Sequence, residues 1–294
     1  MKIIVTVPAY NEQDTIGKVV DEIKGVMESN SYSYAVLVVD DGSKDGTAEI
    51  AKEHGAAVFS HPKNYGLAET FRTEVKKCLE MGADIIVHID ADTQYKAAEI
   101  PKLVKEIENG YDLVLGSRFR GRIESMPLVK RIGNIAFSRA ISRITGLKIS
   151  DAQTGFRAFT MDIAKKIQIS SNHTYTQEQI IRAVREKFRI KEVPIYFAKR
   201  LDKSRLISNP FGYAVRAWIN IIRIYRDYEP LKFFGTVGSA IFGFGVAIGL
   251  FLVYRHITIG LSGRHFGLMM LDVIILSLGF QILIFGFIAD MMRK

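Results

Sequence analysis

Short β-branched runs alternate with segments of helical periodicity up to about residue 118 of this 294-residue chain. The runs are IIVTVP, YAVLVVDD, AAVFSH, DIIVHIDAD and YDLVLGSR, and the first two are separated by apolar residues at helical spacing, from Ile16 to Val26. This alternation predicts an α/β fold, in which a mostly parallel, Rossmann-like sheet carries helices on both faces. Ligands of such sheets bind at the carboxyl ends of the strands.

Polar motifs follow these predicted strands. PAYNE follows the first strand, DDGSKDGT the second, HPKNYG the third and DADTQ the fourth. Neither G-x-G-x-x-G after the first strand nor G-x-x-x-x-G-K-[ST] anywhere is present, which argues against a dinucleotide fingerprint and a phosphate loop. DDGSKDGT taken alone also fits a simple turn, because Asp, Gly and Ser favour turns. Its place at a strand end favours a ligand site.

Asp90, Asp92 and Gln94 form the motif with the clearest chemistry. Alternation along a strand that ends there is expected to aim both aspartates to the same side. Carboxylate and amide oxygens suit Mg²⁺ or Mn²⁺, and Mg²⁺ commonly combines one or two protein carboxylates with substrate phosphates. The motif therefore predicts a site for a metal-bound diphosphate, although an isolated D-x-D also occurs in acidic turns that bind nothing.

Two long apolar segments dominate the C-terminal region, residues 231–294. Residues 233–254 carry no charge, and residues 266–289 carry only Asp272. About 20 such residues cross a bilayer core, so the segments predict a hairpin of two transmembrane helices. An even number of spans returns the chain to its starting side. Because the N-terminus shows no secretion signal, we expect residues 1–205 on the cytoplasmic face. Small residues such as Gly245 and Gly249 also allow close packing with a partner helix, including one from a second copy in a homo-oligomer.

Two further segments have an amphipathic pattern. Residues 127–145 place Leu128, Ile132 and Ile135 on one helical face and Asn134 and Ser138 on another, with arginines and lysines beside them. Residues 206–230 mix tyrosines, a tryptophan and arginines, as at a bilayer interface. Both segments are predicted to be interfacial helices at a membrane surface. The first also fits an ordinary surface helix packed on the sheet.

The charge balance fits a lipid or phosphorylated partner. The formal net charge is +9 and the isoelectric point is about 9.4, which indicates a polyanionic partner. The basic stretches adjoin the apolar segments, and aromatics do not alternate with basic residues in the predicted sheet, so we expect no nucleic-acid binding. Cys78 is the one cysteine, which excludes an internal disulfide and a Cys-based zinc site.

Five motifs together resemble a known family: PAYNE, DDGS, DADTQ, GSR and DAQTGFRAF, in this order. They resemble the family 2 glycosyltransferases of GT-A fold, and more closely the dolichol-phosphate mannose synthase group. The resemblance covers about residues 1–205, and the hairpin matches variants of that group with C-terminal spans. It implies a membrane-anchored enzyme that moves a hexose, with inversion, from a GDP- or UDP-sugar to a polyprenyl phosphate.

The resemblance also assigns roles to residues. Catalytic roles fall on Asp92, Asp151 and Arg118. The metal ligands are Asp90, Asp92 and Gln94, with Mg²⁺ or Mn²⁺ as cofactor. The nucleotide would be held by Pro8, Ala9, Tyr10, Asn11, Glu12, Asp40, Asp41, Asp90, Ala91 and Asp92. The acceptor phosphate would be held by Arg118, Arg131, Asn134, Arg200, Ser204 and Arg205, the last three from a loop similar to the family's R-x-x-x-S-[KR] pattern.

A phosphate acceptor makes a general base largely unnecessary. Its second pKa is about 6, so it is mostly dianionic at neutral pH. Members that use sugar hydroxyls carry Q-x-x-R-W, whereas the nearest string here, QIIRA from Gln179, lacks the tryptophan. Asp151 and then Glu178 are candidates to orient the acceptor or act as a residual base, and Asp151 fits equally a brace for a turn. The alternatives are a family 2 enzyme with another lipid or a sugar-hydroxyl acceptor, and a non-catalytic membrane scaffold.

Overall fold

The structure is a computed structural model that describes the chain except for residues 171–174, 200–218, 220–221, 224, 261–265 and 293–294. The chain divides into two compact units, Met1–Pro210 and Phe211–Lys294. The predicted helix over residues 206–230 lies mostly outside the described residues.

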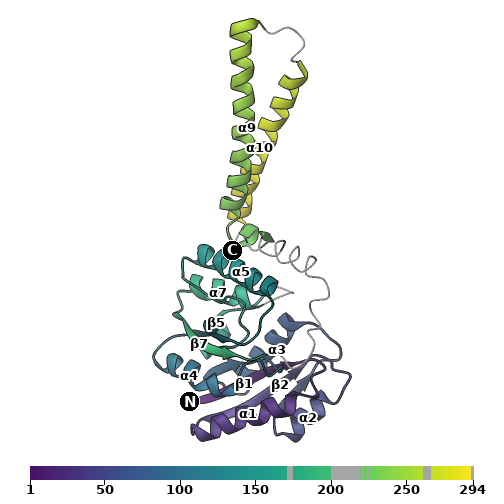
Figure 1. The fold of residues 1–294 in the computed structure, drawn as a ribbon, viewed down its shortest axis with the longest axis vertical. Coiled ribbons are helices and arrows are strands. Elements are labelled where there is room, and N and C mark those ends of the chain that lie inside the picture. The colour runs from purple at the N-terminus through teal and green to yellow at the C-terminus, as the bar shows by residue number, and fades with distance from the viewer. Residues whose placement is uncertain (171–174, 200–218, 220–221, 224, 261–265, 293–294) are drawn as a thin grey trace. The chain divides into compact units, whose positions relative to one another are not determined.

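The first unit is built on a seven-stranded mixed sheet with the order β3-β2-β1-β4-β6-β5-β7 (Figure 1). The strands are β1 (Lys2–Ala9), β2 (Ser33–Asp40), β3 (Ala57–Ser60), β4 (Ile85–His88), β5 (Leu113–Ile123), β6 (Arg157–Thr160) and β7 (Ile190–Phe197). All neighbouring pairs are parallel except those of β6, which is antiparallel to β4 and β5. The predicted mostly parallel α/β sheet is confirmed.

Helices cover both faces of this sheet. They are α1 (Ile16–Ser29), α2 (Thr47–Glu53), α3 (Leu67–Glu80), α4 (Ile100–Glu108), α5 (Leu128–Thr145), α6 (Met161–Lys166) and α7 (Thr176–Arg185), with a 3-10 turn η1 (Ala97–Glu99) before α4. Alternate residues of β1, such as Ile3 and Val5, pack with α1 and α4 in one apolar core. On the other face, Phe71 of α3 stacks on Tyr175 and packs beside Phe159 of β6.

Helix α5 buries polar side chains and leaves part of its apolar stripe exposed. An ordinary surface helix turns its apolar stripe towards the core. In α5 the polar side chains of Asn134 and Ser138 are buried, together with Phe137 and Ile141. Leu128 and Ile132 are instead 73% and 66% exposed. The helix predicted over 127–145 is therefore present, and Leu128 and Ile132 of its apolar stripe are not used for packing in the core.

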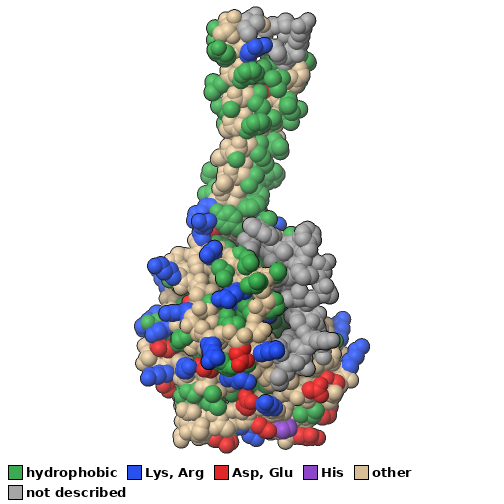
Figure 2. All heavy atoms as spheres, viewed as in Figure 1, with side chains coloured by type: hydrophobic (Ala, Val, Ile, Leu, Met, Phe, Trp, Pro, Cys, Tyr) green, Lys and Arg blue, Asp and Glu red, His purple; other side chains and the backbone are tan. Residues whose placement is uncertain are grey.

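The second unit is a helical hairpin. Helices α9 (Pro230–Ile259) and α10 (Phe266–Met291) pack along each other and are long and apolar enough to cross a membrane. Most of their side chains are exposed, unlike those of a soluble core helix, and Figure 2 shows hydrophobic side chains along the hairpin. Gly245 faces α10 as predicted, since a Cβ there would lie 2.8 Å from Leu276. Asp272 is buried against Gly249.

Candidate active site

The loops that follow β1 and β2 are joined by hydrogen bonds. The Asn11 N–H donates to Ser43 Oγ at 2.8 Å, and Asn11 Oδ1 accepts from the Lys44 N–H at 2.8 Å. The Glu12 N–H donates to Thr47 Oγ1 at 2.9 Å. Asn11 has a φ of 54°, a left-handed conformation that asparagine tolerates. PAYNE and DDGS therefore form one structural element at the carboxyl edge of the sheet.

A pocket of about 530 Å³ opens beside this element. Its lining includes Tyr10, Asp40, His61 and Lys63. Asp40 accepts from the Ser43 N–H at 3.0 Å through Oδ1, and Oδ2 makes no hydrogen bond within the described part of the chain. The pocket therefore offers an aromatic ring and a carboxylate oxygen, which suit a nucleobase with an N–H donor.

Asp41 has a different environment from Asp40. Its carboxylate accepts from the N–H groups of Tyr65 and Gly66 at 2.9 and 2.8 Å, and lies 2.8 Å from Nδ1 of His61. His61 Nε2 lies 2.9 Å from Thr73 Oγ1. Asp41, one of the predicted nucleotide residues, thus holds the loop after β3, which forms one wall of the pocket.

Asp90, Asp92 and Gln94 lie just beyond the end of β4. The strand ends at His88 and Thr93 has a φ of 62°, so strand alternation does not set the direction of Asp92, contrary to the expectation from sequence. Asp92 Oδ1 accepts from the Gln94 N–H at 3.1 Å. Gln94 donates Nε2 to the Ala198 carbonyl at 3.3 Å, and its amide oxygen makes no hydrogen bond to the described residues.

This donor set fits a hard divalent cation. Two carboxylates and one amide oxygen are the ligand types that Mg²⁺ and Mn²⁺ accept. Among the described residues no group of three or more His, Cys, Asp or Glu side chains could hold a metal. A cation at Asp90, Asp92 and Gln94 would therefore take its remaining ligands from water and a bound diphosphate, as Mg²⁺ commonly does.

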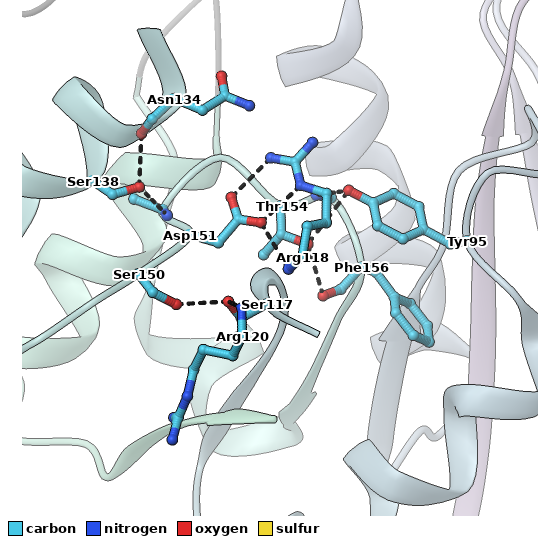
Figure 3. A network of polar contacts seen from close by, with 12 residues as sticks. Tyr95, Ser117, Arg118, Arg120, Asn134, Ser138, Ser150, Asp151, Thr154 and Phe156 are labelled. Carbon is cyan, nitrogen blue, oxygen red and sulfur yellow. Dashed lines mark hydrogen bonds and ion pairs between the residues drawn. The ribbon is translucent and has the colours of Figure 1, made fainter. Parts of the chain in front are cut away.

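Arg118 and Asp151 form a buried ion pair next to this edge (Figure 3). Arg118 donates Nε to Asp151 Oδ2 at 2.7 Å and Nη2 to Oδ1 at 2.8 Å. Burial alone would lower the pKa of Arg118, yet Tyr95 and the Asp151 carboxylate raise it above its ordinary value. Asp151 occupies both oxygens with Arg118, so it is placed to orient the guanidinium. Of the two interpretations of Asp151, this geometry supports the brace.

Further polar side chains fix this pair. Glu192 of β7 accepts from the N–H groups of Ser150 and Asp151 at 2.9 Å each, and so fastens the loop that carries Asp151. Ser138 of α5 accepts from the Ala152 N–H at 3.0 Å. Asn134, with its amide oxygen turned to Arg118, accepts from Nη2 at 3.2 Å. Arg118 Nη1 makes no hydrogen bond to the described residues and remains to bind an anion.

The other predicted acceptor residues are placed differently. Arg131 lies one turn before Asn134 on α5 and is exposed. Arg200, Ser204 and Arg205 lie outside the described residues. Glu178 is buried and accepts from the Ser170 N–H at 3.0 Å and from Arg182 Nε at 2.7 Å, which makes it a brace.

Sequence reasoning missed Glu192, because a lone glutamate in the run IKEVPIYF carries no motif. It also missed the buried Glu74, His88 and Arg157. The only signals for the last two were that His88 lies inside a predicted strand and that Arg157 lies inside the DAQTGFRAF motif.

Comparison with known proteins identifies the family. The profile of Glycosyl transferase family 2 matches residues 4–168, more than half of the chain. A protein named dolichyl-phosphate hexose transferase from Haloferax volcanii is 32% identical over 75% of this chain and 92% of its own length. Glycosyltransferase AglJ from the same organism is 28% identical over 98% of this chain and 93% of its own length.

Solved structures agree on the fold. Glucosyl-3-phosphoglycerate synthase from Mycobacterium tuberculosis, in complex with Mn²⁺ and UDP-glucose, superposes with a TM-score of 0.60 over 76% of this chain and 78% of its own. Its sequence is 19% identical, so the likeness concerns the GT-A fold alone. The profile match, the relatives and the shared fold agree, and the chain belongs to glycosyltransferase family 2.

Proposed function

We propose that this glycosyltransferase moves a hexose from a nucleotide sugar to a polyprenyl phosphate, with inversion at the anomeric carbon. The observation that carries the proposal is the buried Arg118, which Asp151 orients through Nε and Nη2 while Nη1 stays available. A buried, oriented guanidinium is suited to a phosphate group. The name of the Haloferax relative, a dolichyl-phosphate hexose transferase, supports this acceptor.

The donor would lie across the carboxyl ends of β1, β2 and β4. Tyr10 and Asp40 would hold the nucleobase in the pocket beside the PAYNE and DDGS loops. Asp90, Asp92 and Gln94 would hold Mg²⁺ or Mn²⁺ against the diphosphate, and the cation would supply Lewis-acid stabilisation of the departing group. The structural neighbour with the same fold binds UDP-glucose together with Mn²⁺, which supports a nucleotide sugar and a divalent cation in this arrangement.

The reaction needs one bond made and one bond broken. An oxygen of the acceptor phosphate attacks the anomeric carbon while the bond from that carbon to the diphosphate oxygen breaks, and the nucleoside diphosphate leaves. The acceptor is already mostly dianionic at neutral pH, so no protein group has to remove a proton. Arg118, with Arg131 and Asn134 beside it, would position the attacking phosphate. A sugar-hydroxyl acceptor is less well supported, because Asp151 and Glu178 both act as braces.

Membrane attachment places the acceptor within reach. Helices α9 and α10 would anchor the chain as a two-span hairpin, with the catalytic unit on the cytoplasmic face. Helix α5 would lie on the bilayer surface, because it exposes Leu128 and Ile132 with Arg131 and Arg139 nearby. Apolar side chains flanked by basic ones are typical of interfacial helices.

Sugar transfer can be measured directly with purified protein in detergent. We would supply a panel of labelled UDP- and GDP-hexoses, Mn²⁺ or Mg²⁺, and a polyprenyl phosphate, and follow label that moves into the organic phase. The wild type should form a sugar lipid only with metal present, and Asp92→Asn should lose it. No product from any donor, or equal product from Asp92→Asn, would contradict the proposal and favour a scaffold role.

A further inference from the structure

A buried polar cluster lies behind the Asp90 carboxylate, on the face of the sheet covered by α3. It consists of Glu74 of α3, His88 at the end of β4 and Tyr175 before α7, and all three side chains are fully or almost fully buried. His88 Nδ1 lies 2.8 Å from the Glu74 carboxylate and Nε2 lies 2.7 Å from the Tyr175 hydroxyl. Buried polar groups are costly unless they are hydrogen-bonded, so the cluster requires an explanation.

The cluster fixes the imidazole of His88 at a set distance from Asp90. The Glu74 carboxyl group is hydrogen-bonded to Nδ1, and the ring of Tyr175 is stacked on Phe71 at a centroid distance of 3.9 Å. The ring of His88 therefore cannot turn without breaking both hydrogen bonds. In this orientation His88 Nε2 lies 3.7 Å from Asp90 Oδ1.

Gly155 also lies against the Asp90 carboxylate. A Cβ added to Gly155 would lie 2.8 Å from Asp90 Oδ1 and 2.9 Å from Oδ2, so the carboxylate occupies the space that any side chain would need. The Gly155 N–H donates to the Tyr95 hydroxyl at 3.3 Å. The buried Arg157 also donates to the Thr154 carbonyl. The turn with Gly155 is held on both sides, and a side chain there would displace Asp90.

We propose that His88 and Gly155 are positioning residues for the Asp90 carboxylate in metal binding: His88 faces it through Nε2, and Gly155 leaves the space that it occupies. Glu74 and Tyr175 contribute by fixing the His88 ring. The inference rests on the proposed metal site of Asp90, Asp92 and Gln94. Groups that orient a metal ligand typically contribute about 10- to 100-fold to metal affinity.

The test is the dissociation constant of Mn²⁺, measured by electron paramagnetic resonance on the full-length protein with UDP present. Gly155→Ala should weaken Mn²⁺ binding by about 10- to 100-fold. Gly25→Ala is the matched control, because Gly25 lies in α1 with nothing within 4 Å of an added Cβ. That control should bind Mn²⁺ like the wild type.

Two histidine variants separate positioning from folding. His88→Asn keeps a donor near the Nδ1 position, facing Glu74, but has no group at Nε2; His88→Gln places an amide near Nε2. We expect His88→Asn to weaken Mn²⁺ binding about tenfold or more, and His88→Gln to restore much of it, with cooperative thermal unfolding in both. Equal Mn²⁺ affinity in wild type and His88→Asn, or equal losses in the two variants, would overturn the inference. This pair decides the question if Gly155→Ala fails to fold.

Asp92→Asn in the same titration separates failure of the proposed metal site from failure of the proposed positioning role. If Asp92→Asn binds Mn²⁺ as well as the wild type, the metal site itself is wrong. If Asp92→Asn loses Mn²⁺ while His88→Asn and Gly155→Ala keep it, the metal site stands and the positioning role is wrong.

Discussion

Arg118 and Asp151 are joined by two hydrogen bonds of 2.7 and 2.8 Å, and their exposed fractions are only 4% and 0%. A fully desolvated pair is not explained by stability alone, because an apolar pair of the same size often stabilises a protein as well or better. The same geometry leaves Nη1 of Arg118 for an anion. In the proposed function, the pair would therefore connect the folded core with acceptor binding.

Removal of one partner of this pair should be costly. Asp151→Asn leaves the buried guanidinium without its counter-charge, and we expect a loss of about 3 kcal/mol or more in the free energy of unfolding. Urea unfolding measures it. The double variant Arg118→Met, Asp151→Leu should recover part of that stability but have no transfer activity. Full activity in a folded double variant would show that Arg118 does not bind the acceptor.

Glu192 should affect the acceptor and not the donor. Glu192→Gln weakens the hydrogen bonds to the Ser150 and Asp151 N–H groups, so the loop should hold Arg118 less firmly. We expect a higher KM for polyprenyl phosphate with little change in the KM for the nucleotide sugar. Glu186→Gln, at an exposed position after α7, is the control. Equal increases in both KM values would indicate a general loss of structure.

The exposed apolar residues of α5, Leu128 and Ile132, should support the use of polyprenyl phosphate when that acceptor is in a bilayer. Ile132→Ser removes exposed apolar surface, so the melting temperature should stay nearly unchanged, because surface substitutions usually change stability by about 0.5 kcal/mol or less. In liposomes we expect a higher KM for polyprenyl phosphate than for the wild type. Leu67→Ser, at an exposed apolar position on α3, should leave both the melting temperature and the KM for polyprenyl phosphate nearly unchanged. Unchanged liposome kinetics for Ile132→Ser would contradict the interfacial role of α5.

Cys78 should be unreactive in the folded protein. Burial, with a smaller contribution from the Glu74 carboxylate, raises the pKa of the Cys78 thiol well above its ordinary value. Thiols react as thiolates, so a thiol reagent should label the native protein very slowly and the urea-unfolded protein rapidly. Rapid labelling under native conditions would show that α3 opens away from the sheet.

The sequence was sufficient for the parts of the fold that follow local periodicity. The runs that became β1 to β5 and the helix at α5 were visible because side-chain burial alternates with a regular period. β6 has the sequence RAFT, with an arginine and no Val or Ile, and β7 contains Pro194, which an edge strand tolerates, so neither gave a strand signal. The sequence left open whether the apolar residues of α5 are packed or exposed, because a helical pattern shows two faces and not which one is covered.

In the candidate site too, residues within motifs could be predicted from the sequence, whereas residues defined by tertiary contacts could not. The sequence predicted that Asp90, Asp92 and Gln94 follow the fourth strand and that Arg118, Asn134 and Asp151 belong to the site. In the structure the last three are joined by hydrogen bonds. The roles of Asp41 and Glu178 as braces depend on the backbone N–H groups of Gly66 and Ser170, and no motif encodes these contacts.

The most direct test of the proposed function is the identity of the acceptor group. Polyprenyl phosphate and the matching polyprenol should be offered together with the preferred nucleotide sugar and Mn²⁺, and the lipid products measured by mass spectrometry. We predict one product, the polyprenyl phosphate extended by one hexose with its single phosphate retained. A glycosylated polyprenol, with no sugar on the phosphate lipid, would contradict it.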